Sequence, residues 1–266
     1  MTPRKIVIGS VAVGLFAGLA AMFIKMPASW TSGWMLFYVP LVATIVYAFF
    51  HMGAALLFMT SLKVYKTTLK HAYIAIAAGI VALALSTLQV AIIAAFDWWN
   101  TPWSQDGFII LPFLIAGIVV YMGVRKLAKL TGTVSLLRNA LLVIPAIILL
   151  SLLTALLPHV HTTTAEVAFD ASNIFITWTV LMYLAAMLTT LAIKRHMGTH
   201  YTRAMAWLAS GFAVSCTILT VVVVHSLFVD QARGQDVVSM MVDLVGVLSG
   251  VVYLRAGYEF TRTEEV

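Results

Sequence analysis

The sequence predicts an all-α, polytopic integral membrane protein with eight transmembrane helices and both termini in the cytoplasm. Apolar residues make up 62% of its 266 residues and charged residues 10%, a composition that would leave large apolar patches on a soluble globule. Eight apolar runs are each long enough for a helix to cross roughly 30 Å of hydrocarbon. All but two of the 16 lysines and arginines, Lys25 and Arg233, fall in alternate gaps between these runs, and the positive-inside rule makes those gaps cytoplasmic.

The runs leave only short connections between them. They cover residues 6–24, 35–62, 72–96, 107–124, 139–157, 173–193, 204–229 and 238–254. We therefore expect residues 1–266 to form a single transmembrane domain in the cell membrane. The net charge of +6 follows from this topology, so it predicts contact with the lipid bilayer and not with nucleic acid. Homo-oligomers and partner subunits in a membrane complex are both compatible with the pattern.

The first run follows Arg4 and Lys5, as the apolar part of a signal peptide would. It is longer than such a segment, and no clear small-x-small cleavage site precedes Lys25. Gly14 and Gly18 also give it a small-residue face suited to close helix packing. We therefore interpret it as a retained helix.

Polar side chains share one face of the second run. Thr44, Tyr47 and His51 lie three and four residues apart, which places them on one side of a helix. The third run has a small and polar face that is suited to receive them, made of Gly79, Ala82, Ser86 and Gln89. These side chains either line a pathway or form interhelical hydrogen bonds, and the sequence does not distinguish the two.

The connection after the fifth run contains His159 and His161, with Glu166 and Asp170 following. Imidazole and carboxylate groups suit zinc or copper, so a metal or cation site on the outer side is one interpretation. Two histidines one residue apart are weak evidence for such a site, because extended loops often carry them for solvation alone. The pattern therefore favours a solvated loop over a metal site.

Asp243 is the one carboxylate well inside a predicted span, about five residues from the outer end of the last run. Such a group is costly in a membrane and usually faces protein. Gly246 and Gly250 share its face and predict a closely packed neighbour. His225, near the outer end of the preceding run, lies at a similar depth. The pair is predicted either to relay a proton or bind a ligand, or to fix helix register through a buried hydrogen bond.

A weak self-similarity relates the two halves of the chain, at a separation of almost half its length. It pairs Gly79 with Gly211, Asp97 with Asp230, Gly117 with Gly250 and Tyr121 with Tyr253. Residues 1–133 and 134–266 would then be two four-helix repeats related by an axis along the membrane normal. The alternative is eight unrelated helices of similar composition.

Several cofactors and reactions are disfavoured. His51 and His225 differ by roughly 20 Å in depth, too far for a bis-histidine haem, and residues 238–254 contain no lysine to hold retinal. The sequence lacks the common phosphate-binding, hydrolase, metalloprotease and paired-cysteine motifs, so we do not expect it to be an enzyme by itself. A quinone or a metal stays open.

Three functions remain. The first is a carrier or channel-like protein that binds a proton, cation or small solute in the outer half of the bundle. The candidate ligand or relay residues are Asp243, His225, His51, Tyr47 and Gln89. The second is a quinone-reactive membrane anchor subunit of a redox complex. The third discounts the first helix and leaves a seven-helix sensory or receptor module.

Overall fold

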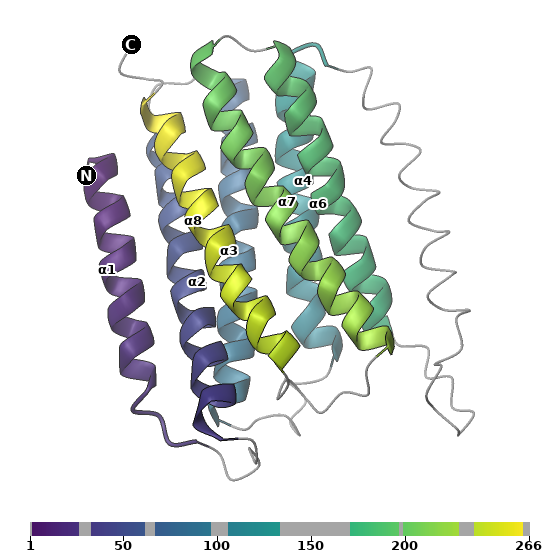
Figure 1. Ribbon diagram of the computed structural model, residues 1–266. Helices are drawn as coiled ribbons and strands as arrows, with labels where there is room; N and C mark the ends of the chain where they lie inside the picture. The colour runs from purple at the N-terminus through teal and green to yellow at the C-terminus, as the bar shows by residue number, and fades with distance from the viewer. Residues whose placement is uncertain are drawn as a thin grey trace.

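The computed structural model describes residues 2–26, 33–61, 67–96, 106–133, 171–196, 199–228 and 237–262 (Figure 1). All secondary structure in these ranges is helical, and each of the seven helices is long and apolar enough to cross a membrane. The helices are α1 (Pro3–Ala21), α2 (Trp34–Thr60), α3 (Thr67–Phe96), α4 (Asp106–Leu130), α6 (Ala171–His196), α7 (Thr199–Phe228) and α8 (Val237–Arg262). The protein is thus an all-α, multi-pass membrane protein.

Seven of the eight predicted runs correspond to these helices. The fifth run, residues 139–157, lies outside the described residues, so the eighth helix stays a prediction. The last run was predicted too short, because α8 continues from residue 254 to Arg262. Charged residues lower the hydropathy there, but Arg255 and Glu259 are four residues apart and form an ion pair along the helix.

Six helices form a closed ring, in which α2 contacts α3, α3 contacts α4, α4 contacts α6, α6 contacts α7, α7 contacts α8, and α8 returns to α2. Within α2–α4 and within α6–α8, helices that follow one another in the chain pack together because their connections are short, whereas α4 contacts α6 although 40 residues separate them. The ring closes where the first and last of its helices meet, and this α2–α8 contact is extensive. The ring supplies most of the described core, including Phe58, Tyr183, Phe212 and Tyr253.

Helix α1 lies outside this ring, at one edge of the bundle (Figure 1). It packs mainly on α2 through its two small residues. A Cβ atom at Gly14 would lie 3.1 Å from the Cβ of Phe49, and one at Gly18 would lie 3.0 Å from Val46. The opposite face is open, and Phe16 is 75% exposed. The glycines therefore let α1 approach α2 while its larger residues face outward.

The α2–α8 interface also depends on glycine. Gly246 faces the ring of Tyr47, Gly250 faces Phe50 and His51, and Gly257 faces Leu57. A Cβ at Gly250 would lie 2.8 Å from the Cβ of Phe50, closer than carbon atoms normally pack. The face predicted around Asp243 is therefore the one that packs on α2.

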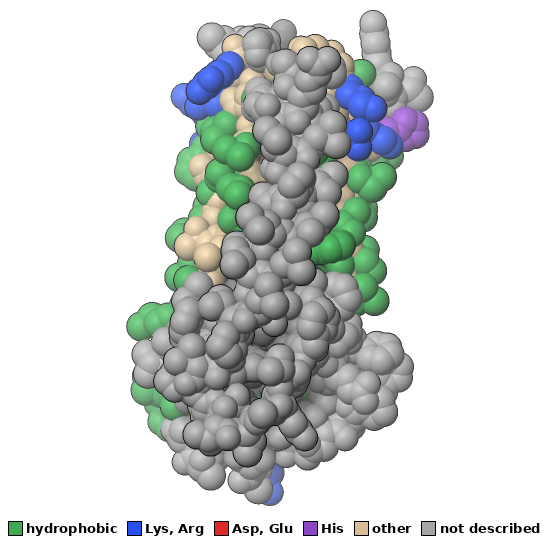
Figure 2. Space-filling view, turned by 90° about the vertical axis from the view of Figure 1, so that its right-hand side faces the viewer, with side chains coloured by type: hydrophobic (Ala, Val, Ile, Leu, Met, Phe, Trp, Pro, Cys, Tyr) green, Lys and Arg blue, Asp and Glu red, His purple; other side chains and the backbone are tan. Residues whose placement is uncertain are grey.

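The described surface is apolar along the middle of the helices and basic at one end. Figure 2 shows hydrophobic side chains along the middle and Lys and Arg side chains near the top. The start of α1 and the end of α8 point toward this same end (Figure 1), which we call the basic end. Apolar side chains such as Leu56 and Leu248 are more than half exposed, as expected for contact with lipid. That the basic end is cytoplasmic remains a prediction.

Candidate functional site

A cavity of about 260 Å³ lies inside the six-helix ring. All six helices contribute to its wall. It lies nearer the end opposite the basic end, because Asp243 is in the second turn of α8 and Val90 is in the last two turns of α3. Most of the lining is apolar, with Leu83, Val90 and Phe113 among it. A few polar groups in an apolar pocket are the usual composition of a small-molecule site.

Half of the polar lining groups come from α2 and α8, and the others are Thr87, Thr179 and Ser215. Thr44 and Tyr47 of α2 line the cavity beside Asp243 of α8, and the Thr44 hydroxyl is near enough to the Asp243 carboxyl group to interact with it. Ser215 lines it from α7, and its Oγ lies 3.1 Å from the hydroxyl of Tyr253. Thr87 lines it from α3, but its hydroxyl is bonded to carbonyls of its own helix. Asp243 is thus the single carboxylate among the described lining residues.

A buried network continues from this wall into the protein. The Nδ1 atom of His51 lies 2.9 Å from the carbonyl oxygen of Tyr47, and its Nε2 atom lies 3.4 Å from the Oγ atom of Ser249. The Oγ atom of Ser249 also lies 2.9 Å from the carbonyl oxygen of Gly246, and its hydroxyl is near enough to the Tyr47 side chain to interact with it. His51 and Ser249 are fully buried. The network therefore connects a cavity residue, Tyr47, to a histidine that has no access to solvent.

The hydrogen positions in this network follow from its acceptors. A carbonyl oxygen only accepts, so Nδ1 of His51 carries a hydrogen that it donates to Tyr47. The single hydroxyl hydrogen of Ser249 then goes either to Nε2 of His51 or to the carbonyl of Gly246. In the second case Nε2 must itself carry a hydrogen and donate to Ser249. The two complete arrangements differ by one proton on His51.

The structure brings together some of the predicted residues. Asp243 and Tyr47 line the same cavity, and His51 lies behind Tyr47. The stripe of Thr44, Tyr47 and His51 does not pack on Gly79 of α3 as expected, because Gly79 faces Val120 and the backbone of α4. Gln89 lies in α3 outside the cavity lining, and its side chain has an interaction within the protein.

Other predicted residues fall outside the described parts. His225 belongs to α7, but its side chain is not among those described, so its pairing with Asp243 stays a prediction. His159 and His161 lie outside the described residues altogether. Within the described ranges, no three His, Cys, Asp or Glu side chains gather to hold a metal ion.

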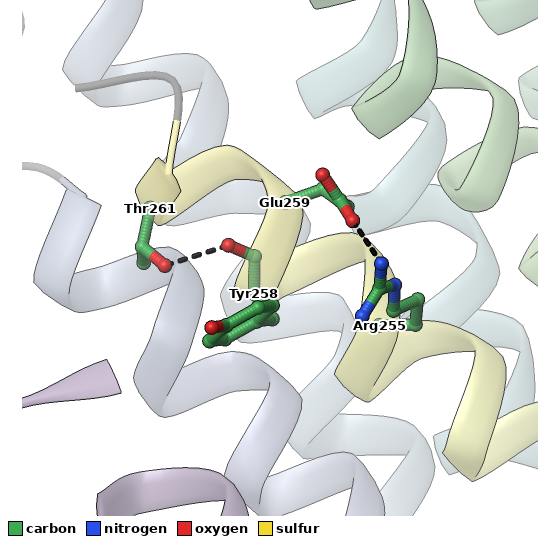
Figure 3. Close-up of polar contacts among 4 residues, drawn as sticks. All are labelled: Arg255, Tyr258, Glu259 and Thr261. Carbon is green, nitrogen blue, oxygen red and sulfur yellow. Dashed lines mark hydrogen bonds and ion pairs between the residues drawn. The ribbon is translucent and has the colours of Figure 1, made fainter. Parts of the chain in front are cut away.

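Sequence reasoning missed a second buried carboxylate. Glu259 is 5% exposed and forms an ion pair with Arg255 one turn earlier on α8 (Figure 3). The Arg255 guanidinium also lies 6.0 Å from the ring of Trp207 and 5.7 Å from that of Tyr258. The spacing of Arg255 and Glu259 was the available signal. This pair lies at the basic end, away from the cavity, and we assign it to anchoring the end of α8.

The fold and cavity define the class: an α-helical, multi-pass membrane protein with a small internal site. Comparison of the chain with protein-family models, curated proteins and solved structures finds no match. The function is therefore argued from the site.

Proposed function

We propose that this protein is a membrane carrier that binds a small solute in the cavity of the six-helix ring. The observation that supports the proposal is the cavity itself. It has a volume of about 260 Å³, is lined mostly by apolar side chains with one carboxyl group, and is enclosed by the six-helix ring. A carboxyl group inside a membrane protein is costly and marks a ligand or ion pathway more often than a structural contact. The volume suits a small organic solute with its polar group toward Asp243.

A one-sided receptor would use the same cavity differently. It would open the cavity toward one side of the membrane, whereas a carrier opens it to each side in turn. The seven-helix receptor and the quinone-reactive anchor both remain alternatives. Access from the two sides separates a carrier from either, and it can be measured before any solute is known.

The experiment places one cysteine in the cavity. Cys216 is a free cysteine and the single one in the chain, so Cys216→Ala gives a cysteine-free background. Thr87→Cys is then added, because the Thr87 hydroxyl bonds only carbonyls of its own helix. Sealed right-side-out and inverted vesicles are treated with a membrane-impermeant, charged methanethiosulfonate reagent. A carrier is labelled at Thr87→Cys from both sides.

The control is Leu248→Cys in the same background, because Leu248 is 52% exposed on the outer surface of the bundle near the middle of α8, where lipid and not water is expected. It should react from neither side. Labelling of Thr87→Cys from one side alone would point to a receptor-type site. Absence of labelling from both sides would mean a closed internal void, and either result would refute the carrier.

A further inference from the structure

The cavity lies between two groups of three helices whose contacts correspond. In the ring, α2, α3 and α4 are followed by α6, α7 and α8, so each helix lies three places from its counterpart in the other group. That is the arrangement a two-fold axis through the ring would generate. It matches the order expected from the self-similarity between the two halves of the chain.

Glycine contacts correspond in detail. Gly79 of α3 faces Val120 of α4, and its counterpart Gly211 of α7 faces Tyr253 of α8. A Cβ at Gly117 would lie 3.3 Å from the Cβ of Met182, and one at Gly250 would lie 2.8 Å from the Cβ of Phe50. In that comparison Gly117 is the counterpart of Gly250, and Met182 the counterpart of Phe50.

The register of these pairs is consistent within each helix. The difference in residue number between a residue and its counterpart is the same for α2 with α6 as for α3 with α7. For α4 with α8 this difference is larger by one residue. One additional residue between α7 and α8 accounts for the difference, and connections accept such insertions readily. The contacts thus relate Val120, and not Tyr121, to Tyr253.

Counterparts also face each other across the cavity. Its lining contains four such pairs: Tyr47 with Thr179, Leu83 with Ser215, Thr87 with Leu219, and Phe113 with Gly246. The axis that relates the two groups therefore passes through the cavity. A site on such an axis would have two similar walls if the side chains were equal.

The walls are chemically different. At the α2–α8 interface stand Thr44, Tyr47 and Asp243, with His51 and Ser249 behind them. At the α4–α6 interface, Tyr183 occupies the position of His51, Ala116 that of Ser249, and Phe113 that of Gly246. One wall thus carries a carboxyl group, whereas the opposite wall presents Phe113 and Thr179 and has no carboxyl group among its described lining residues.

We propose that the cavity binds a small amphipathic monocation, an organic ammonium whose charged nitrogen meets Asp243 and whose apolar body lies against Phe113 and Leu83. This inference rests on the proposed function and names its substrate class. The cavity is in the interface between two related three-helix halves, which diverged to place a carboxyl group on one wall. No lysine, arginine or histidine is among the described lining residues, so a cationic ligand would supply the counter-charge to an ionised Asp243 within this lining. The aromatic rings of Tyr47 and Phe113 add favourable contacts for a cation.

The test compares three probes of similar shape. Benzyltrimethylammonium, benzyl alcohol and benzoate are added to the purified full-length protein in mild detergent, and the melting temperature is followed with probe concentration. The cation is expected to stabilise the protein at concentrations at least tenfold lower than the alcohol, and benzoate is expected to have no effect. Equal responses to cation and alcohol, or a response to benzoate, would overturn the proposal.

Asp243→Asn keeps the shape of the side chain and removes its charge. Loss of a charge-assisted contact should raise the half-effective concentration of the cation by roughly 10-fold to 100-fold and leave that of the alcohol unchanged. Glu259→Gln is the matched control, because it removes a buried carboxylate on the same helix at the basic end. An unchanged cation response in Asp243→Asn would refute the assignment. If Asp243→Asn does not fold, the ranking of the three probes on the unaltered protein still decides.

The two experiments fail separately. Labelling of Thr87→Cys from both sides without a preference for the cation would support the carrier function and refute the proposed substrate class. A preference for the cation with labelling from one side alone would support the amine-binding site and refute the carrier function.

Discussion

Replacement of Gly250 by alanine tests the close approach of α2 and α8. The new Cβ would lie 2.8 Å from the Cβ of Phe50 and 3.2 Å from Nδ1 of His51. Carbon atoms pack best about 3.5–4.0 Å apart, so α2 and α8 would have to separate by about 1 Å. The neighbour is a Cβ atom, not the end of a flexible chain, and a change of rotamer cannot relieve the contact. Overpacking of this kind costs about 1–3 kcal/mol.

Two other glycines give a graded series. At Gly117 the nearest atom to a new Cβ would be 3.3 Å away, so a shift of a few tenths of an ångström suffices and Gly117→Ala should cost less than ~1 kcal/mol. Gly9 has no atom within 4 Å, and Gly9→Ala should be neutral or slightly stabilising, because alanine favours helix.

The assay is the free energy of unfolding in mixed micelles, followed by helical circular dichroism as denaturing detergent is increased. Stability should fall in the order Gly9→Ala, Gly117→Ala, Gly250→Ala. Equal stability of all three variants would show that α2 and α8 are not in close contact. A Gly9→Ala variant less stable than Gly250→Ala would contradict the placement of α1 as well.

Two further predictions concern buried polar groups. Arg255→Gln leaves the carboxylate of Glu259 buried without its partner and should lower the free energy of unfolding by about 1–3 kcal/mol. The double variant Arg255→Gln with Glu259→Gln should regain part of this loss. Additive effects in the double-mutant cycle would show that the ion pair contributes nothing to stability. Ser249→Ala removes the hydrogen-bonding partner of the buried His51 and should cost about 1–3 kcal/mol. Ser210→Ala should have a negligible effect, because its exposed hydroxyl bonds only its own helix, and a stability change of equal size in both variants would refute the network.

The helices and their relative orientation were predictable because the apolar runs and the alternation of basic gaps are strong local signals. The end of α8 was not, since Arg255 and Glu259 read as a polar tail until their pairing on the helix is seen. Within α8, the face of Gly246 and Gly250 predicted a close neighbour but not which one. Hydropathy carries no information on helix order, so the contact with α2 needed the structure.

The candidate site was predictable in its members more than in its arrangement. Asp243 and the stripe of Tyr47 and His51 stand out because polar side chains are rare inside apolar runs. The sequence indicated no link between them, and the connection through Thr44 and Ser249 depends on ring closure. Ser215 and Thr87 gave no signal, since serine and threonine are common in membrane helices and most bond their own backbone.

Closure of the ring between its first and last helices has a consequence for biosynthesis. His51 and Ser249, which meet across that closure, are 198 residues apart in the chain. During synthesis α2 enters the bilayer long before α8. Its polar stripe therefore faces lipid or a helper protein until α8 is released from the ribosome. The cavity wall between α2 and α8 is therefore completed last, and a truncated chain that lacks α8 retains most of the described helices without ever forming that wall.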